Sequence, residues 1–179
     1  MAVNEILKRQ HAVLNRLSQL PRKMLALKDQ GNITEFVLHE LCHTDCFDLE
    51  KAAYFIDNPD FDCLKGVAGV WRPEVYTTPN NDIWQNPSLF TAHMQGSLFN
   101  QKVRDFIRPS LRKSKESDEE IVRMIGQELH MQNPGYYAWD MKHDNHGLLI
   151  YEKPYKTGDA CDIDMVLNGL SLLSFCPIF

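Results

Sequence analysis

Long apolar runs are missing from this 179-residue sequence. No stretch approaches the roughly 18 consecutive apolar residues of a transmembrane helix, and charged residues interrupt the first nine positions before a signal-peptide core could form. We therefore expect a soluble protein that has no contact with membranes and stays in the cytoplasm.

An even set of cysteines is also lacking. The chain has five cysteines, which are Cys42, Cys46, Cys63, Cys161 and Cys176. An odd number cannot pair completely within one chain, and the spacing follows no disulfide framework. Reduced thiols are the simpler interpretation.

Positive charge is in deficit, since the formal net charge is -5 at pH 7. Nonspecific affinity for nucleic acid comes mainly from neutralising phosphates. The net negative charge therefore disfavours nucleic acid as a partner, except at a local patch. The sequence also lacks a glycine-rich phosphate loop, a dinucleotide fingerprint and a serine-nucleophile elbow. We accordingly expect no cofactor.

What the sequence does contain is typical of a globular protein, with 44% apolar and 24% charged residues. The length suits one core, and no repeat or linker divides the chain. We expect a single domain over residues 1–179.

The hydrophobic periodicity, together with capping residues, prolines and glycines, predicts the order of helices and strands. The helices and strands that we expect are a helix over 3–28 that Pro21 ends or kinks, a helix over 33–43, a short helix over 48–56, strands within 60–85, a long helix over 86–107, a helix capped by Ser117 and Glu120, a strand over 147–151 and a helix over 163–170. This pattern predicts a helix-rich α+β fold, with a small mixed or antiparallel sheet built from the Val67 and Leu148 regions.

The segment His39-Glu40-Leu41-Cys42-His43 could carry chemistry. Two histidines four residues apart on a helix point to one side, so their rings can share a zinc ion while the glutamate polarises bound water. This segment resembles the HExxH motif of the zinc metallopeptidases of the zincin class. The resemblance implies His39 and His43 as metal ligands and Glu40 as catalytic base.

A catalytic zinc also needs a third protein ligand and an open position for water. Asp48, Glu50 and Glu74 are the donors that we consider for the third position. A structural zinc site would instead use His43, Cys46 and Cys63, with His39 or Cys42, because zinc prefers thiolates and imidazoles. Buried apolar packing of the cysteines is the competing interpretation.

Two shorter resemblances involve carboxylates next to histidines. Glu40 with His43, and Asp140 with His143, are each similar to half of the ligand set of a di-iron four-helix bundle. His143-Asp144 resembles the dyad of the HD phosphohydrolases, although the surrounding run predicts a loop.

A local concentration of positive charge could bind a partner. Its members are Lys102, Arg104, Arg108, Arg112, Lys113 and Lys115. The cluster predicts a surface for an acidic protein or a small anionic ligand, while a solvated helix end is the alternative. Several aromatic residues could line a pocket or pack in the core, and these are Trp71, Trp84, Tyr136, Tyr137 and Trp139.

No constellation in the sequence is complete enough to define an enzyme. The leading hypothesis is therefore a noncatalytic cytoplasmic binding or regulatory protein. The alternative is a zinc-dependent hydrolase that uses His39, Glu40 and His43.

Overall fold

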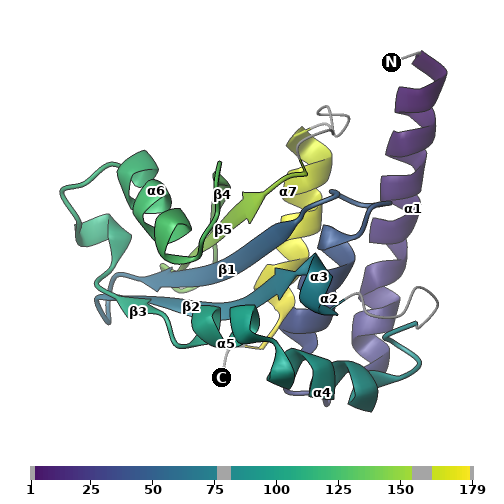
Figure 1. Cartoon of the computed structure of the whole chain (residues 1–179), viewed down its shortest axis with the longest axis horizontal. Coiled ribbons are helices and arrows are strands. Elements are labelled where there is room, and N and C mark those ends of the chain that lie inside the picture. The colour runs from purple at the N-terminus through teal and green to yellow at the C-terminus, as the bar shows by residue number, and fades with distance from the viewer. Residues whose placement is uncertain (1–2, 76–81, 155–162, 178–179) are drawn as a thin grey trace.

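A computed structural model describes residues 3–75, 82–154 and 163–177, which form a five-stranded sheet with helices on both faces (Figure 1). The helices are α1 (Val3–Ala26), α2 (Ile33–Cys42), α3 (Arg72–Val75), α4 (Pro87–Gly96), α5 (Leu98–Arg104), α6 (Asp118–Glu128) and α7 (Ile163–Ser171). The strands are β1 (Lys51–Asn58), β2 (Cys63–Trp71), β3 (Ile107–Arg108), β4 (Gly135–Asp140) and β5 (His146–Glu152). The predicted helix-rich α+β class is confirmed.

The sheet is antiparallel throughout, with strand order β3-β2-β1-β5-β4. The regions expected to build it, around Val67 and Leu148, lie in β2 and β5. These two strands do not pair with each other, because β1 lies between them and pairs with both.

The prediction of a helix over 48–56 was wrong, because this segment supplies the central strand β1. Six successive residues of β1, from Ala52 to Asp57, are buried. A strand covered on both faces loses the alternation of apolar and polar residues, so its sequence cannot be told from a buried helix by periodicity.

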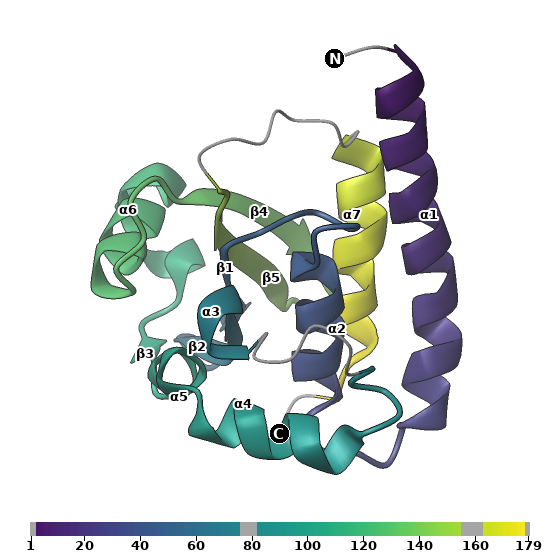
Figure 2. The ribbon, with the colours of Figure 1, turned by 45° about the vertical axis from the view of Figure 1, so that its right-hand side comes forward.

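Side chains that alternate along β1 enter two separate cores. Tyr54 points to the core formed with α1, α2 and α7, whereas Phe55 points to the core formed with α5 and α6. Figure 2 shows the three layers edge-on, with α1 as the outermost helix on one side.

Helix α1 continues through Pro21, where we expected an end or a kink that begins a second helix. Proline removes one backbone donor but leaves the helical dihedral angles accessible, so neighbouring contacts decide whether the helix goes on. Leu20, which is fully buried, fixes this turn against the core.

The single long helix predicted over 86–107 is in fact two helices followed by the short strand β3. Ser97 ends α4 and caps α5, because its hydroxyl accepts a hydrogen bond from the Asn100 amide at 3.1 Å and donates one to Glu74 at 2.5 Å. The capping box of Ser117 and Glu120 at the start of α6 is confirmed.

Candidate functional site

Helix α2 carries the HExxH segment and is buried along its whole length. Its first residue, Ile33, and its last, Cys42, are both covered, because α2 lies between the sheet and α1 (Figure 2). Polar side chains on such a helix need partners inside the protein.

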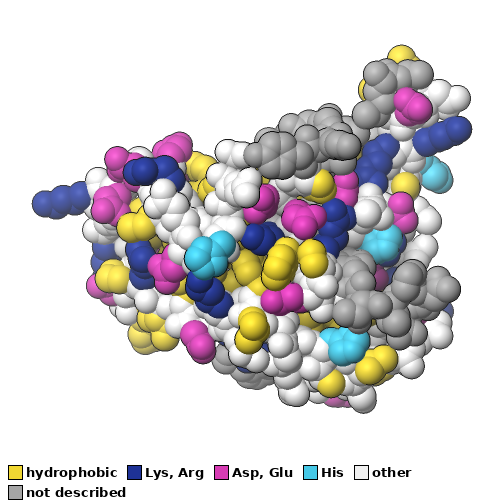
Figure 3. All heavy atoms as spheres, viewed as in Figure 1, with side chains coloured by type: hydrophobic (Ala, Val, Ile, Leu, Met, Phe, Trp, Pro, Cys, Tyr) yellow, Lys and Arg dark blue, Asp and Glu magenta, His cyan; other side chains and the backbone are white. Residues whose placement is uncertain are grey.

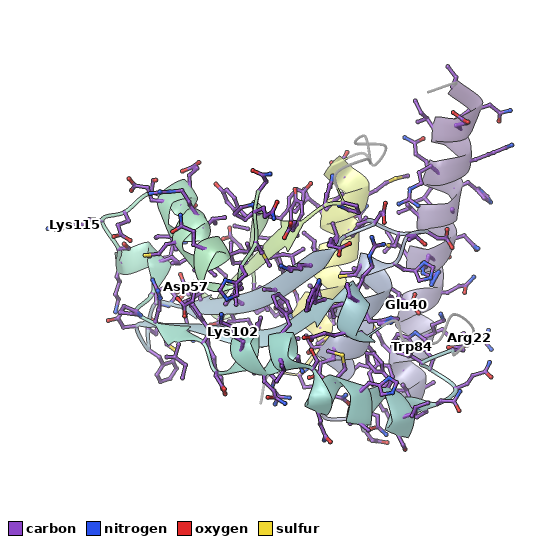
Figure 4. All side chains as sticks on the ribbon, viewed as in Figure 1. Arg22, Glu40, Asp57, Trp84, Lys102 and Lys115 are labelled. Carbon is purple, nitrogen blue, oxygen red and sulfur yellow. The ribbon has the colours of Figure 1, made fainter. Side chains whose placement is uncertain are left out.

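Glu40 is held by three donors from two other segments. Its carboxylate accepts from Arg16 Nε at 2.7 Å and Lys23 Nζ at 3.4 Å, both on α1. It also accepts from Trp84 Nε1 at 2.6 Å, and Figure 4 shows Glu40 and Trp84 side by side. The carboxylate therefore joins α1, α2 and the segment before α4.

These donors set the charge state of Glu40. Burial by itself raises the pKa of Glu40, but Arg16, the Trp84 hydrogen bond and Lys23 outweigh burial and leave the pKa below its ordinary value. A general base that works near neutral pH gains from a raised pKa, so this environment suits an ion-paired structural carboxylate better.

His39 lies in an apolar environment one residue earlier. Its ring packs edge-on against the Phe90 ring, with centroids 5.1 Å apart. Burial lowers the pKa of His39 to about 4, against the opposing effect of the Glu40 carboxylate. His39 is therefore neutral at pH 7, which is the state that either a core residue or a metal ligand requires.

His43 lies just beyond the end of α2, where the backbone turns extended with ψ of 149°. Its Nδ1 accepts a hydrogen bond from the Asp45 amide at 3.1 Å. Partial burial, aided by Arg16, lowers the pKa of His43. The His43 side chain therefore starts from the loop that follows α2, one residue after the helix ends.

The three donors considered for a third zinc ligand are engaged elsewhere. Asp48 and Glu50 both pair with Arg72, at 2.7 and 3.5 Å, and Glu74 accepts from Ser97. Within residues 3–75, 82–154 and 163–177, no group of three or more His, Cys, Asp or Glu residues could hold a metal ion.

The structural zinc set is not brought together either. Cys42 lies next to the start of β1, because its carbonyl accepts from the Leu49 amide. Cys63 pairs with Asn58 at the other end of β1, about 23 Å along the strand. Cys46 is buried in the same core as Cys42, and Cys161 lies outside the described residues.

Asp140, His143 and Asp144, from the other two resemblances, lie on a hairpin, whereas Glu40 lies on α2 and His43 at its end. His143 and Asp144 occupy the β4–β5 turn with φ of 60° and 56°, the left-handed values of type I′ turns. The Asp140 carboxylate accepts a hydrogen bond from the ring Nδ1 of His146 at 2.8 Å, at the base of the same hairpin. Asp140 with His143, and His143 with Asp144, are therefore not on a helix, unlike the motifs they resemble.

Four of the six clustered cations already have partners. Arg104 pairs with Glu35, Arg108 with Glu128, and Arg112 with Asp140. Lys102 donates to the Glu128 carbonyl. Figure 3 shows cationic and acidic side chains interspersed on this side of the molecule rather than one positive patch.

Lys113 and Lys115, which have no ion pair in the described structure, lie at a cavity of about 410 Å³ between β3 and α6. The cavity, which we call the β3–α6 cavity, is lined by Asp62, Arg108, Pro109, Ser110, Leu111, Lys113, Ser114, Lys115, Glu116, Ile121 and Met124. Lys115 extends outward from its rim (Figure 4).

Ser110 in the cavity wall has a buried hydroxyl. The residue is 1% exposed, and among the described residues its Oγ has no hydrogen-bond partner. Leaving a buried hydroxyl unpaired costs about 1–3 kcal/mol, so such a group needs an explanation.

Two carboxylates, of which Asp57 is buried and Asp62 is exposed, fix the backbone of this wall. Asp57 on β1 accepts from the Leu111 and Arg112 amides at 3.2 and 3.3 Å, and Asp62 accepts from the Ser110 amide at 3.1 Å. The positive cluster had indicated this region, but no sequence signal pointed to Ser110, because its burial depends on contacts 48 to 55 residues away.

The aromatic residues that could line a pocket are divided between core and surface. Trp139 stacks on Tyr54, and Trp84 packs against Phe36. Tyr136 and Tyr151 border a second cavity of about 610 Å³ beside α6.

None of the helices in the described ranges is long and apolar enough to cross a bilayer. Comparison with protein-family models, with curated proteins and with solved structures found no match to this chain.

Proposed function

We propose that the chain is a noncatalytic cytoplasmic binding protein that holds a small anionic ligand in the β3–α6 cavity. The observation that carries this proposal is the buried, unpartnered hydroxyl of Ser110 in the wall of a cavity that also has two lysines without ion pairs. An anionic ligand in the cavity would meet the charge of the lysines, and a small shift of the wall would bring one of its oxygens to the Ser110 hydroxyl, which is 1% exposed.

The cavity limits the charge and the size of the ligand. Asp62 and Glu116 also line it, and Arg108 is already paired with Glu128, so the net positive charge available is small. A carboxylate or a singly charged phosphate ester fits this balance better than a polyphosphate. Small-molecule sites commonly measure about 300–1,000 Å³, so the cavity has the size for a small metabolite.

The test is a titration of the whole protein with inorganic phosphate and, separately, with acetate, followed by backbone NMR. We expect saturable shifts confined to residues 108–117. Lys113→Ala/Lys115→Ala should weaken binding at least tenfold. Lys8→Ala/Lys28→Ala removes the same charge from residues on and just after α1, and it should leave binding unchanged. Equal losses in both double variants, or no saturable shift, would contradict the proposal.

Ser110→Ala gives an independent check on the same site. Without ligand, it should leave the melting temperature unchanged or raise it, because alanine removes an unpaired buried hydroxyl. In the phosphate titration it should weaken binding several-fold. A large loss of stability in the ligand-free variant would mean that the hydroxyl has a structural partner, and the site would lose its main support.

The zinc-hydrolase alternative stays a prediction. It requires Glu40 to act on water while Arg16, Lys23 and Trp84 compete for the same carboxylate oxygens. Metal analysis of protein purified without a histidine tag separates the two functions. Near-stoichiometric zinc that is lost in His39→Ala would favour the hydrolase.

A further inference from the structure

A second cavity, which we call the α6–β4 cavity, lies where α6 and the loop after it meet the start of β4 and the end of β5. It measures about 610 Å³, and small-molecule sites commonly measure about 300–1,000 Å³. Among the described residues it shares no lining residue with the β3–α6 cavity, so the two can be tested separately. Its lining residues that carry a ring or a charge are Glu119, Arg123, Pro134, Tyr136, Tyr151 and Lys153.

Two of the rings in this cavity are fixed by contacts with glycines. The Tyr151 ring stacks on Tyr137, with centroids 5.3 Å apart, and it lies so close to Gly135 that a Cβ atom there would be 2.6 Å from it. Pro134 lies against Gly126 of α6, where a Cβ atom would likewise be 2.6 Å from the proline ring. These walls are therefore formed before a ligand binds, which lowers the entropic cost of binding.

Arg123 gives the cavity a cation that can bind an anion. It is exposed and makes no ion pair within the described part of the chain. Glu119 lies one turn earlier on α6, at a spacing that allows an ion pair with Arg123, but its carboxylate accepts a hydrogen bond from the Tyr136 hydroxyl at 3.3 Å. The guanidinium is therefore available to an external carboxylate.

The charges of the lining favour a ligand with one negative charge. Lys153 adds a second cation, and its Nζ lies over the Tyr151 ring, 5.8 Å from the centroid. Arg123 and Lys153 together carry two positive charges against the single negative charge of Glu119, which leaves one net positive charge. A monoanion balances this charge, whereas a cation would be repelled.

We propose that the α6–β4 cavity binds a small aromatic carboxylate. The ligand carboxylate pairs with Arg123, because a guanidinium matches a carboxylate with two parallel hydrogen bonds. The ligand ring lies against the tyrosine and proline rings of the lining. Aromatic rings attract one another in offset and edge-on arrangements, so an aromatic ring gains more from tyrosine walls than a saturated ring of the same size does.

Titration of the whole protein with benzoate, followed by backbone NMR, tests the proposal. We expect saturable shifts at residues 119–136 and 151–153. Cyclohexanecarboxylate keeps the carboxylate but has a saturated ring, and it should bind several-fold more weakly than benzoate. Benzamidinium keeps the aromatic ring but carries a positive charge, and it should not bind.

Three single variants test the charges of the cavity. Arg123→Gln should weaken benzoate binding at least tenfold, because it removes the guanidinium. Arg22→Gln removes the same charge from an exposed position on α1, across the molecule from α6 (Figures 1 and 4), and it should leave binding unchanged. Glu119→Gln should strengthen binding, since the amide oxygen can still accept from Tyr136 while the negative charge is gone.

Four results would overturn the proposal. Benzoate could produce no saturable shift in the expected residues, or shift only residues 108–117 of the β3–α6 cavity. Cyclohexanecarboxylate or benzamidinium could bind as tightly as benzoate, or Arg123→Gln and Arg22→Gln could bind benzoate equally. Failure of phosphate to bind in the β3–α6 cavity would contradict the function proposed above but not this second site, because the two cavities have separate linings.

Discussion

At the scale of single residues, Glu40 joins separate parts of the chain. It is 4% exposed, and its partners come from α1 and from the segment before α4. A buried carboxylate is tolerated only when donors replace its lost hydration. The residue that a motif search selects as a catalytic base therefore has a structural task.

Glu40→Gln tests that task. Removing the negative charge leaves the Arg16 and Lys23 cations partly buried without their counter-charge, and breaking a buried pair in this way typically costs about 3–5 kcal/mol. We expect a loss near the lower limit, because both cations keep some exposure to water. Glu128→Gln, which breaks the exposed pair with Arg108, should cost less than about 1 kcal/mol. Urea unfolding of both variants measures the difference.

His39 should make stability depend on pH. Its pKa is about 4 in the folded protein and near 6.5 when unfolded, so the unfolded chain binds the extra proton first as the pH falls. The folded state should lose about 2 kcal/mol between pH 7 and pH 5 from this residue alone. Glu40 acts in the same direction, but only near and below pH 4.5, since its pKa is lowered.

Unfolding by urea at a series of pH values checks the effect of His39. His39→Leu should flatten the slope between pH 7 and pH 5, with a remainder from His43, whose pKa is also lowered. Equal slopes in the wild type and in His39→Leu would show that this ring does not control acid stability.

At the scale of elements, the contact of α5 with β2 depends on a close approach between backbones. A Cβ atom built at Gly66 would lie 1.8 Å from the Val103 carbonyl oxygen, and one at Gly69 would lie 2.7 Å from the Val103 side chain. Only glycine lets the helix lie this near the strand.

Gly66→Ala should therefore force α5 away from the sheet and cost about 1–3 kcal/mol or more. Gly96→Ala is the control, because a Cβ there meets nothing within 4 Å and the residue lies in the last turn of α4. It should be neutral or stabilise the fold by up to about 1 kcal/mol. Thermal unfolding compares the two variants, and similar melting temperatures would contradict the close contact.

Elements with their own local signals could be predicted from the sequence. The capping box at Ser117 located α6, and the amphipathic repeat located most of α1. β1 could not be predicted, because its central place in the sheet depends on β5, whose Leu149 is the partner of Tyr54 across 95 residues. β4 was missed although its partner β5 was predicted, because none of its residues is buried and its sequence therefore lacks an aliphatic run.

The candidate site likewise has residues that local sequence indicated and residues whose role depends on distant contacts. Local charge indicated Lys113 and Lys115, but the burial of Ser110 depends on Asp57 and Asp62, which are distant in sequence. For His39 and His43, the four-residue spacing describes only an expected helical turn. It contains no information about Phe90 or Trp84, which the fold brings against α2.

At the scale of the whole molecule, the three layers predict an order of local stability. β1 is paired on both edges and covered on both faces, whereas β3 and β4 are the edge strands. Amides of β1 should therefore exchange with deuterium most slowly, and those on the outer edge of β4 among the fastest of the sheet. Protection of β4 equal to that of β1 would mean that another element covers its edge.

The central place of β1 also has a consequence for synthesis on the ribosome. β2 follows within a few residues, but β5 emerges some 95 residues later, roughly 5–20 s at ordinary rates of translation. During that interval the run Ala52-Ala53-Tyr54-Phe55-Ile56 has an unpaired edge and no charge to discourage association with other nascent chains. A chaperone that binds exposed apolar segments would find one in this run.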